Sequence, residues 1–323
     1  MKLKFLIILI IIFCSQNNYA QHTDVINSNR PGESMSAFAV GKTVVQIESG
    51  LSFLNEKHSV LKYKANGTGL DFNLRYGIFK EQLETILEIA YQNDSYVNDL
   101  GTLKRTGLRS STMGVKYLVY DPFKYAVEKV NLYSWKANHK FNWKQLIPAV
   151  AVYGGVNLNF SNNPFISKEE NLSVISPKFM VISQSHFGNG YVFLVNIFMD
   201  KIGTDFQSLE YIITLTKGFN EQWSAFIENK AIKGDYYADV IFRGGAAYLL
   251  NKNLQVDASI SKNYKGTPAI VYGGVGISWR SDTNHKDVMI KAKKEKKKKD
   301  KSKKGKEKAK AKKRLDEIEL TKP

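Results

Sequence analysis

The chain has 323 residues, of which 43% are hydrophobic and 12% aromatic, so it holds enough apolar material to fold and wholesale disorder is excluded. A single cysteine excludes a disulfide framework and paired-thiol redox chemistry. Most of the net charge of +17 comes from residues 286–323, which carry 18 basic and 7 acidic side chains. The rest of the chain has an ordinary charge balance, so the total charge does not by itself indicate a nucleic-acid-binding protein.

Residues 1–20 have the layout of a secretory signal peptide. Two lysines precede an apolar run over residues 5–13, and a polar stretch follows it. This run is shorter than the roughly 17 to 25 residues that a membrane-spanning helix needs, and no later window is long enough. We therefore expect an exported protein whose mature chain begins near Gln21, has lost Cys14, and crosses no membrane as a helix.

Apolar and polar residues alternate through most of the chain between positions 43 and 280. In the first such stretch Val45 and Ile47 fall on one face, and Gln46 and Glu48 on the other. A period of two residues is the pattern of a β-strand rather than of a helix. The same pattern predicts about twelve strands, near residues 43–54, 69–79, 82–93, 106–120, 145–160, 173–184, 191–199, 207–218, 222–232, 237–249, 253–262 and 268–280.

The predicted connections alternate between short and long, and most of the predicted strands are longer than the usual 5 to 6 residues. Both features are typical of outer-membrane barrels, which have tight turns at one rim and long loops at the other. One link, residues 121–144, is an exception, because it is long although it lies at the rim of the short turns. The expected short turns are 77–81, 217–221 and 250–253, and the expected long loops are 55–68, 94–105, 161–172 and 200–206.

The polar face of the strands carries charges of both signs. In a soluble sandwich this face would be solvated and a second sheet would cover each apolar face. In a barrel the charges line a lumen and the apolar face, including Leu74 and Val256, meets lipid. The acidic side chains of this face are Glu48, Asp71, Glu84, Glu88, Glu210, Glu228, Asp239 and Asp257, and the basic ones are Arg75, Lys116, Lys178, Lys230, Arg243 and Arg280.

Strand length, export and loop asymmetry together favour an all-β fold, a transmembrane antiparallel up-and-down β-barrel of about 12 strands. Because the lumen would hold water, we expect removal of Arg75 or Glu88 to alter conduction more than folding. Aromatic residues near the strand ends are suited to interfacial girdles, although core aromatics would look similar. They are Phe53, Tyr91, Tyr117, Phe160, Tyr191, Tyr211, Trp223, Tyr248 and Trp279.

Several short segments resemble a family of bacterial outer-membrane barrels that are labelled transporters or meta-pathway phenol-degradation proteins. The segments are Ser-Asn-Arg-Pro-Gly-Glu-Ser at 28–34, Val-Gly-Lys at 40–42 with the strand that follows, Ile-Gly-Thr-Asp-Phe at 202–206, and the stretches 223–228 and 242–257. The resemblance covers about residues 28–280. It implies a Gram-negative outer-membrane location and the movement of small compounds, hydrophobic ones included. The chain departs from the usual pattern because 43 residues follow the aromatic-tipped last strand.

We expect four parts: a signal peptide over 1–20, an N-terminal periplasmic or lumen segment over 21–42, the barrel over 43–280, and a disordered Lys-rich periplasmic tail over 281–323. Arg30 and Glu33 lie in the second part and have partners of opposite charge on the barrel wall. The Arg-Pro-Gly-Glu stretch, which begins with Arg30 and ends with Glu33, is therefore expected to fold into or beneath the lumen and narrow it.

The sequence offers weak candidates for catalysis and metal binding. Ser185 and His186 are adjacent, so on a strand they would point to opposite faces, and a polar turn is the preferred interpretation. Glu84 and Glu88 would serve as an acid and base, but an ion-paired lumen wall explains them more simply. The five histidines lack metal-ligand spacing. We therefore expect no enzymatic activity, no cofactor and no metal.

Two functions remain for such a chain. The first is an outer-membrane channel or transporter for small solutes, in contact with outer-membrane lipids. The second is a structural envelope protein whose barrel anchors the cationic tail. That tail would bind anionic cell-wall polymers, anionic lipid or an acidic protein, and export argues against nucleic acid as its partner.

Overall fold

The computed structural model describes residues 25–122, 147–159, 163–165, 174–187 and 190–283. The expected signal peptide, nearly all of the 121–144 link and nearly all of the Lys-rich tail lie outside these residues. Among the described residues, no helix is long and apolar enough to cross a membrane.

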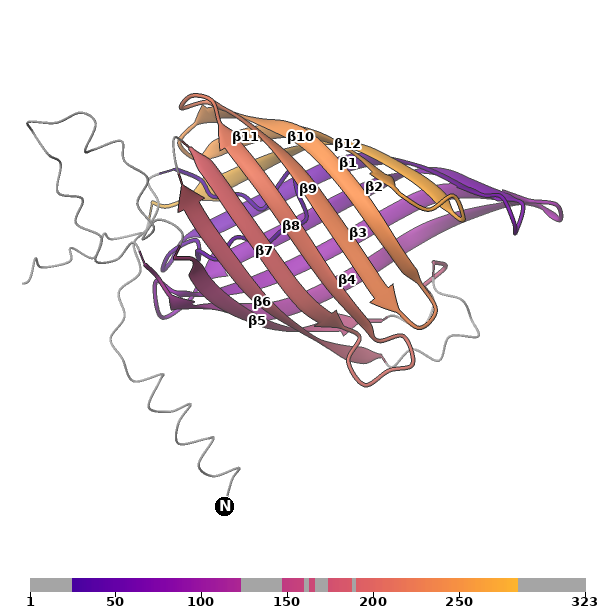
Figure 1. The fold of residues 1–323 in the computed structure, drawn as a ribbon, viewed down its shortest axis with the longest axis horizontal. Helices are drawn as coiled ribbons and strands as arrows, with labels where there is room; N and C mark the ends of the chain where they lie inside the picture. Colours follow the sequence, from indigo (N-terminus) through magenta and orange to yellow (C-terminus); the bar gives the residue numbers. More distant parts are fainter. Residues whose placement is uncertain (1–24, 123–146, 160–162, 166–173, 188–189, 284–323) are drawn as a thin grey trace, which may run out of the picture. The chain divides into compact units, whose positions relative to one another are not determined.

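Twelve antiparallel strands form one closed barrel, in which each strand pairs with its neighbours in the chain and β1 pairs with β12 (Figure 1). The prediction of an all-β, up-and-down barrel of about twelve strands is confirmed. The strands are β1 (Val45–His58), β2 (Tyr63–Gly77), β3 (Leu83–Asn98), β4 (Gly101–Tyr120), β5 (Ala149–Leu158), β6 (Ile175–Phe187), β7 (Tyr191–Asp200), β8 (Ser208–Gly218), β9 (Trp223–Gly234), β10 (Ala238–Asn251), β11 (Leu254–Asn263) and β12 (Ala269–Ser281).

Two of the expected long loops are wrong, because β1 to β4 continue through them. The β1–β2 ladder still pairs Lys57 with Lys64, and the β3–β4 ladder still pairs Val97 with Thr102. In Figure 1 these two hairpins reach well beyond the other strands. Both faces of the extensions carry polar residues, so the apolar alternation stops although the backbone pairing does not. Hydrophobic periodicity therefore marks the lipid-facing part of a strand and misses its solvated end.

The outer surface of the barrel is apolar. Leu51, Leu70 and Val275 pair across three adjacent strands, and all three are exposed, Leu51 by 57%. Near the rim of short turns lies the exposed Trp279, and the ring centroids of Trp223 and Tyr248 are 4.8 Å apart. No second sheet covers this surface in the described part of the chain, so the sandwich interpretation is wrong. An apolar band edged by aromatic rings matches a lipid-facing wall.

Residues 25–42 form no strand and run inside the barrel. Near their start Ile26 donates a backbone hydrogen bond to Lys252 in the β10–β11 turn (2.8 Å), and just beyond their end Thr43 donates one to Gly77 at the end of β2 (2.9 Å). Both ends of this N-terminal segment are thus fixed at the rim of short turns. Between them the chain makes a loop that the polar inner face of the sheet surrounds.

Candidate functional site in the barrel lumen

Four charged side chains from β1 to β4 meet on the inner face of the barrel near the rim of short turns. Arg75 lies 3.3 Å from Glu48 and 3.0 Å from Glu84, and Glu84 also lies 2.6 Å from the Lys116 ammonium. All four side chains are fully inaccessible to solvent. We call these residues the buried cluster. With two cations and two carboxylates it is neutral overall, which is the arrangement that burial of charge requires.

The buried cluster holds the backbone of the N-terminal segment. Arg75 donates to the Asn27 carbonyl (2.7 Å), and Lys116 donates to the carbonyls of Ser36 (2.6 Å) and Phe38 (3.0 Å). In return the Val40 amide donates to the Glu84 carboxylate (2.8 Å). These bonds satisfy backbone groups that a buried loop would otherwise leave unpaired.

The strand pattern predicts that these four residues line open water, but in the structure they are buried. Their alternation on the polar face is as expected, because period two fixes the face. The alternation gives no information about the N-terminal segment, which packs against that face and excludes water from the four side chains.

Two neutral amides on the opposite wall also bind the N-terminal segment, and sequence reasoning missed both. The Gln184 side-chain oxygen accepts hydrogen bonds from the Ser36 hydroxyl and the Ala37 amide, both 2.9 Å. Asn196 donates to the Met35 carbonyl (2.9 Å). Gln184 belongs to β6, which runs to Phe187, so the polar turn expected at Ser185 and His186 is wrong. The only signal was an amide at an inward position of a strand, which for Asn196 lies between the apolar Val195 and Ile197.

Residues 30–33 form the tip of the N-terminal segment and contact a different part of the wall. The Arg30 guanidinium donates to the two carboxylate oxygens of Asp257 on β11 (3.1 and 3.3 Å). The Glu33 carboxylate pairs with Lys230 on β9 (3.1 Å) and with Arg243 on β10. These side chains keep contact with solvent: Arg30 is 13% exposed and Glu33 42%.

A third acidic residue holds the backbone at the tip. The Glu228 carboxylate of β9 accepts the Glu33 amide (3.1 Å), the Ser34 amide (3.3 Å) and the Thr214 hydroxyl (2.9 Å). Burial in the lumen by itself raises the pKa of the Glu33 carboxyl, but Arg243 and Lys230 outweigh burial and hold that pKa well below its usual value. Glu33 is therefore ionised and pairs as a full charge at neutral pH.

Two glycines make the space that the Arg30 side chain occupies. Gly50 of β1 and Gly276 of β12 pair directly across the sheet. A methyl group added at either position would lie 2.3 Å from the Arg30 guanidinium. Only glycine at these sites lets the guanidinium lie against the wall and reach Asp257.

The N-terminal segment divides the lumen into two cavities. The inner cavity, of about 670 Å³, lies at the rim of short turns, where the N-terminal segment, the ends of β6, β8 and β10 and the starts of β7 and β9 line it. The outer cavity, of about 460 Å³, lies on the side of the other rim. Residues 29–32 line both cavities. They form the shared wall, so the tip is the partition.

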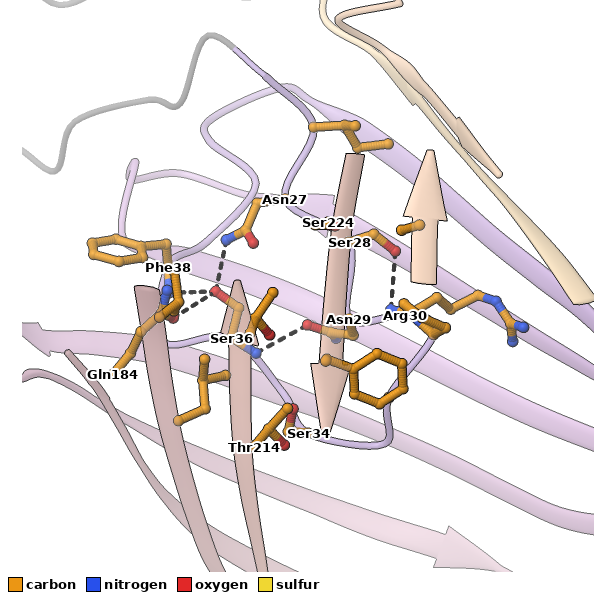
Figure 2. A pocket seen from close by; sticks show the side chains of 18 of the residues that line it. Asn27, Ser28, Asn29, Arg30, Ser34, Ser36, Phe38, Gln184, Thr214 and Ser224 are labelled. Atoms are coloured by element: carbon orange, nitrogen blue, oxygen red, sulfur yellow. Dashed lines mark hydrogen bonds between the residues drawn. The ribbon is translucent and has the colours of Figure 1, made fainter. Parts of the chain in front are cut away.

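The two cavities differ in chemistry. Apolar side chains such as Phe38, Leu194 and Phe226 line the inner cavity together with hydroxyl and amide groups, and Figure 2 shows Ser34, Ser36 and Thr214 among these polar groups. Its charged lining residues are Arg30 and Asp121. The outer cavity instead has ten charged lining residues: Arg30, Glu33, Asp71, Glu88, Arg109, Lys178, Asp200, Glu210, Lys230 and Arg243.

The remaining charges of the predicted lumen set fall in two places. Asp71, Glu88 and Glu210 line the outer cavity, and Glu210 pairs with Lys230 (3.2 Å). Asp239 and Arg280 line neither cavity. Asp239 accepts a bond from Asn263 (2.6 Å), and Arg280 donates to Asn253 (3.0 Å). Both lie at a strand end, where the inward side chain bonds to a residue at the end of the neighbouring strand or in a turn instead of facing the lumen, so these two depart from the expected transport role.

Sequence reasoning also missed Arg109, at an irregular position in β4 where the register with β3 shifts. Its guanidinium donates to the Tyr272 hydroxyl of β12 (3.3 Å), between strands that are not neighbours in the sheet. Across the described residues, no group of three or more His, Cys, Asp or Glu side chains is arranged to hold a metal ion.

The closed sheet, its apolar exterior and its polar, partly filled lumen define the class of this protein: a membrane-spanning β-barrel of the outer-membrane type. Residues 28–281 match the family model described as "Putative MetA-pathway of phenol degradation", and the chain belongs to that family. The resemblance noted in the sequence is thereby confirmed.

Solved structures with the same fold include an outer membrane channel from Pseudomonas putida F1. It is 9% identical, with a TM-score of 0.50, over 79% of this chain and 100% of that one. The KdgM porin (9% identity, TM-score 0.42, 71% and 98% covered) and the CymD monoaromatic hydrocarbon channel (9%, 0.40, 74% and 88%) are more distant in structure. No curated protein matches the sequence significantly.

Proposed function

We propose that the protein is an outer-membrane channel for small solutes, exported with a signal peptide that is cleaved near residue 20. Solutes pass between the outer and the inner cavity inside one barrel. The observation that supports this path is the shared wall: residues 29–32 separate the cavities, and they belong to the N-terminal segment and not to the barrel. The envelope-tether alternative is not favoured by the family match.

The lining of the inner cavity supports a class of solute. A neutral molecule with an apolar body and one or two hydrogen-bonding groups satisfies both the apolar and the polar groups of this lining. A charged solute would leave water for a wall that offers few countercharges, which is costly. We therefore infer that the inner cavity accepts small neutral amphipathic solutes. Phenol is a suitable probe in view of the family description.

We expect phenol to interrupt the ion current of the full-length protein in a planar bilayer more than benzoate of similar size does. Changing Leu194 to Asn keeps the number and branching of the side-chain heavy atoms but removes an apolar contact from the inner cavity. It should lower the apparent affinity of phenol roughly threefold to tenfold. Asp200→Asn, in the outer cavity at the end of β7, is the control and should leave the phenol block unchanged. Ion current that phenol does not affect would exclude this solute class.

For the tail we propose a separate role on the basis of composition: binding to anionic cell-wall polymer or an acidic periplasmic protein. The full-length protein in detergent is expected to cosediment with purified peptidoglycan at low salt, and to lose this property at about 0.5 M salt. A chain ending at residue 285 is expected not to cosediment. Equal sedimentation of the two chains would exclude cell-wall binding by the tail.

A further inference from the structure

The N-terminal segment is attached to the barrel by two different kinds of contact. Its feet, Asn27 and residues 35–40, bond to side chains that solvent barely reaches, such as Arg75, Lys116 and Gln184. Its tip, residues 30–33, is held through ion pairs in which Arg30 and Glu33 keep partial contact with solvent, and through a backbone bond from Glu33 to Glu228. Water can replace the partner of an exposed charge, but it cannot do so for a buried one. The tip therefore separates from the wall at a lower free-energy cost than the feet.

We propose that the tip is a gate that swings between the two cavities while the feet stay in place, and that its ion pairs to β9, β10 and β11 hold it closed. This mechanism rests on the channel function proposed above. In the closed position residues 29–32 are the shared wall. Moving them joins the inner and outer cavities without moving any strand.

The charges around the tip fit such a gate. Arg30 and Glu33 have opposite sign and are held on different strands, by Asp257 and by Lys230 with Arg243. When the tip leaves, Lys230 keeps Glu210 at 3.2 Å and Arg243 keeps Glu228 at 3.6 Å. The two wall cations therefore keep acidic partners in the open position, and Asp257 is the wall charge that loses its partner to lumen water. Because all three ion pairs must break, each one contributes to the closed population.

The wall is also shaped for the closed position. The space over Gly50 and Gly276 is filled by the Arg30 guanidinium, the movable end of a long side chain. Adding a methyl group at Gly276 would displace this guanidinium from Asp257 without changing any charge. Gly273 is on the same strand, and a methyl group there would meet nothing within 4 Å. Gly276→Ala and Gly273→Ala are thus a matched pair that tests the position of Arg30 alone.

The experiment measures movement of the tip and conduction separately. Ser34, next to the tip, is 6% exposed in the closed position, so a cysteine there should react slowly with a water-soluble thiol reagent. In full-length Cys14→Ser, Ser34→Cys protein in vesicles, we expect Asp257→Asn and Glu33→Gln each to raise the labelling rate roughly fivefold. The double variant should raise it further. Single-channel recordings of the same variants should show a parallel rise in the open fraction.

Salt dependence and the glycine pair provide the controls. Raising KCl from about 0.1 to about 1 M should speed labelling in the parent protein that carries only the reporter cysteine. It should not do so in the Asp257→Asn, Glu33→Gln double variant, because the ion pairs of its tip are already removed. Gly276→Ala should speed labelling and Gly273→Ala should not. Asp200→Asn removes a charge from the outer cavity at the end of β7, a strand that holds no part of the tip, and should leave the labelling rate at the value of the parent.

Each result decides one question. If none of the variants that remove an ion pair of the tip changes the labelling rate, the gate is overturned. Faster labelling in the variants without any ion current would retain a mobile tip but overturn the channel function on which the gate rests. If one variant fails to insert, the salt series on the parent protein and the Gly276→Ala variant still decide whether the tip moves.

Discussion

Replacing Arg75 by alanine is expected to destabilise the folded barrel by about 3 to 5 kcal/mol. The change leaves Glu48 and Glu84 buried with a single cation, Lys116, and it removes a donor from the Asn27 carbonyl. A buried carboxylate without its partner costs far more than the ion pair itself contributes. Unfolding by urea in phospholipid vesicles, followed by tryptophan fluorescence and by heat-modifiable gel mobility, measures the loss.

Two controls separate burial from charge. Arg109→Ala removes a guanidinium whose hydrogen bond goes to Tyr272 in the outer cavity, and it should cost less than about 1 kcal/mol. Glu88→Ala, also in the outer cavity, should leave a folded barrel with altered ion preference. Equal destabilisation by Arg75→Ala and Arg109→Ala would show that the buried cluster is not dry. For Arg75 this expectation replaces the one drawn from the sequence, which placed it in lumen water.

The second large effect concerns the lipid-facing wall. Leu51→Arg is expected to cost about 2 to 4 kcal/mol, because Leu51 lies near the middle of the apolar band. It is six residues beyond Val45, where β1 begins. Six tilted residues correspond to roughly 15 Å along the barrel axis, about half the height of that band. Leu74 and Val256 also point outward but lie within three residues of the short-turn rim, so arginine there should cost only about 0 to 1 kcal/mol.

The matched control is Ser110→Arg, which places the same charge on the outer-cavity wall. It should fold with a cost well under 1 kcal/mol, since the long side chain can reach lumen water. Folding yields into vesicles and urea midpoints of the three kinds of variant measure the depth profile. Equal tolerance of arginine at positions 51 and 110 would show that the inner and outer faces are assigned wrongly.

The sequence alone determined the fold class and the faces of the strands. Alternation with period two is a local property of the strand, so Glu48, Arg75 and Glu84 fell on the inner face without knowledge of any contact. Strand length, the signal peptide and the asymmetry of the loops predicted a barrel, and short motifs over residues 28–280 indicated the family. The ends of β1 to β4 were missed because pairing of the backbone continues where the hydrophobic pattern stops.

Only the tertiary structure decided what each inward side chain does. Arg75 and Glu88 have the same pattern in sequence, yet one is buried under the N-terminal segment and the other lines a cavity. The difference arises because residues 25–42 pack against one part of the lumen wall and leave another open. The space over Gly50 and Gly276 was missed for the same reason, since the Arg30 side chain that fills it comes from a distant position in the chain. Local periodicity contains no record of such long-range contacts, so the division of the lumen was visible only in the folded barrel.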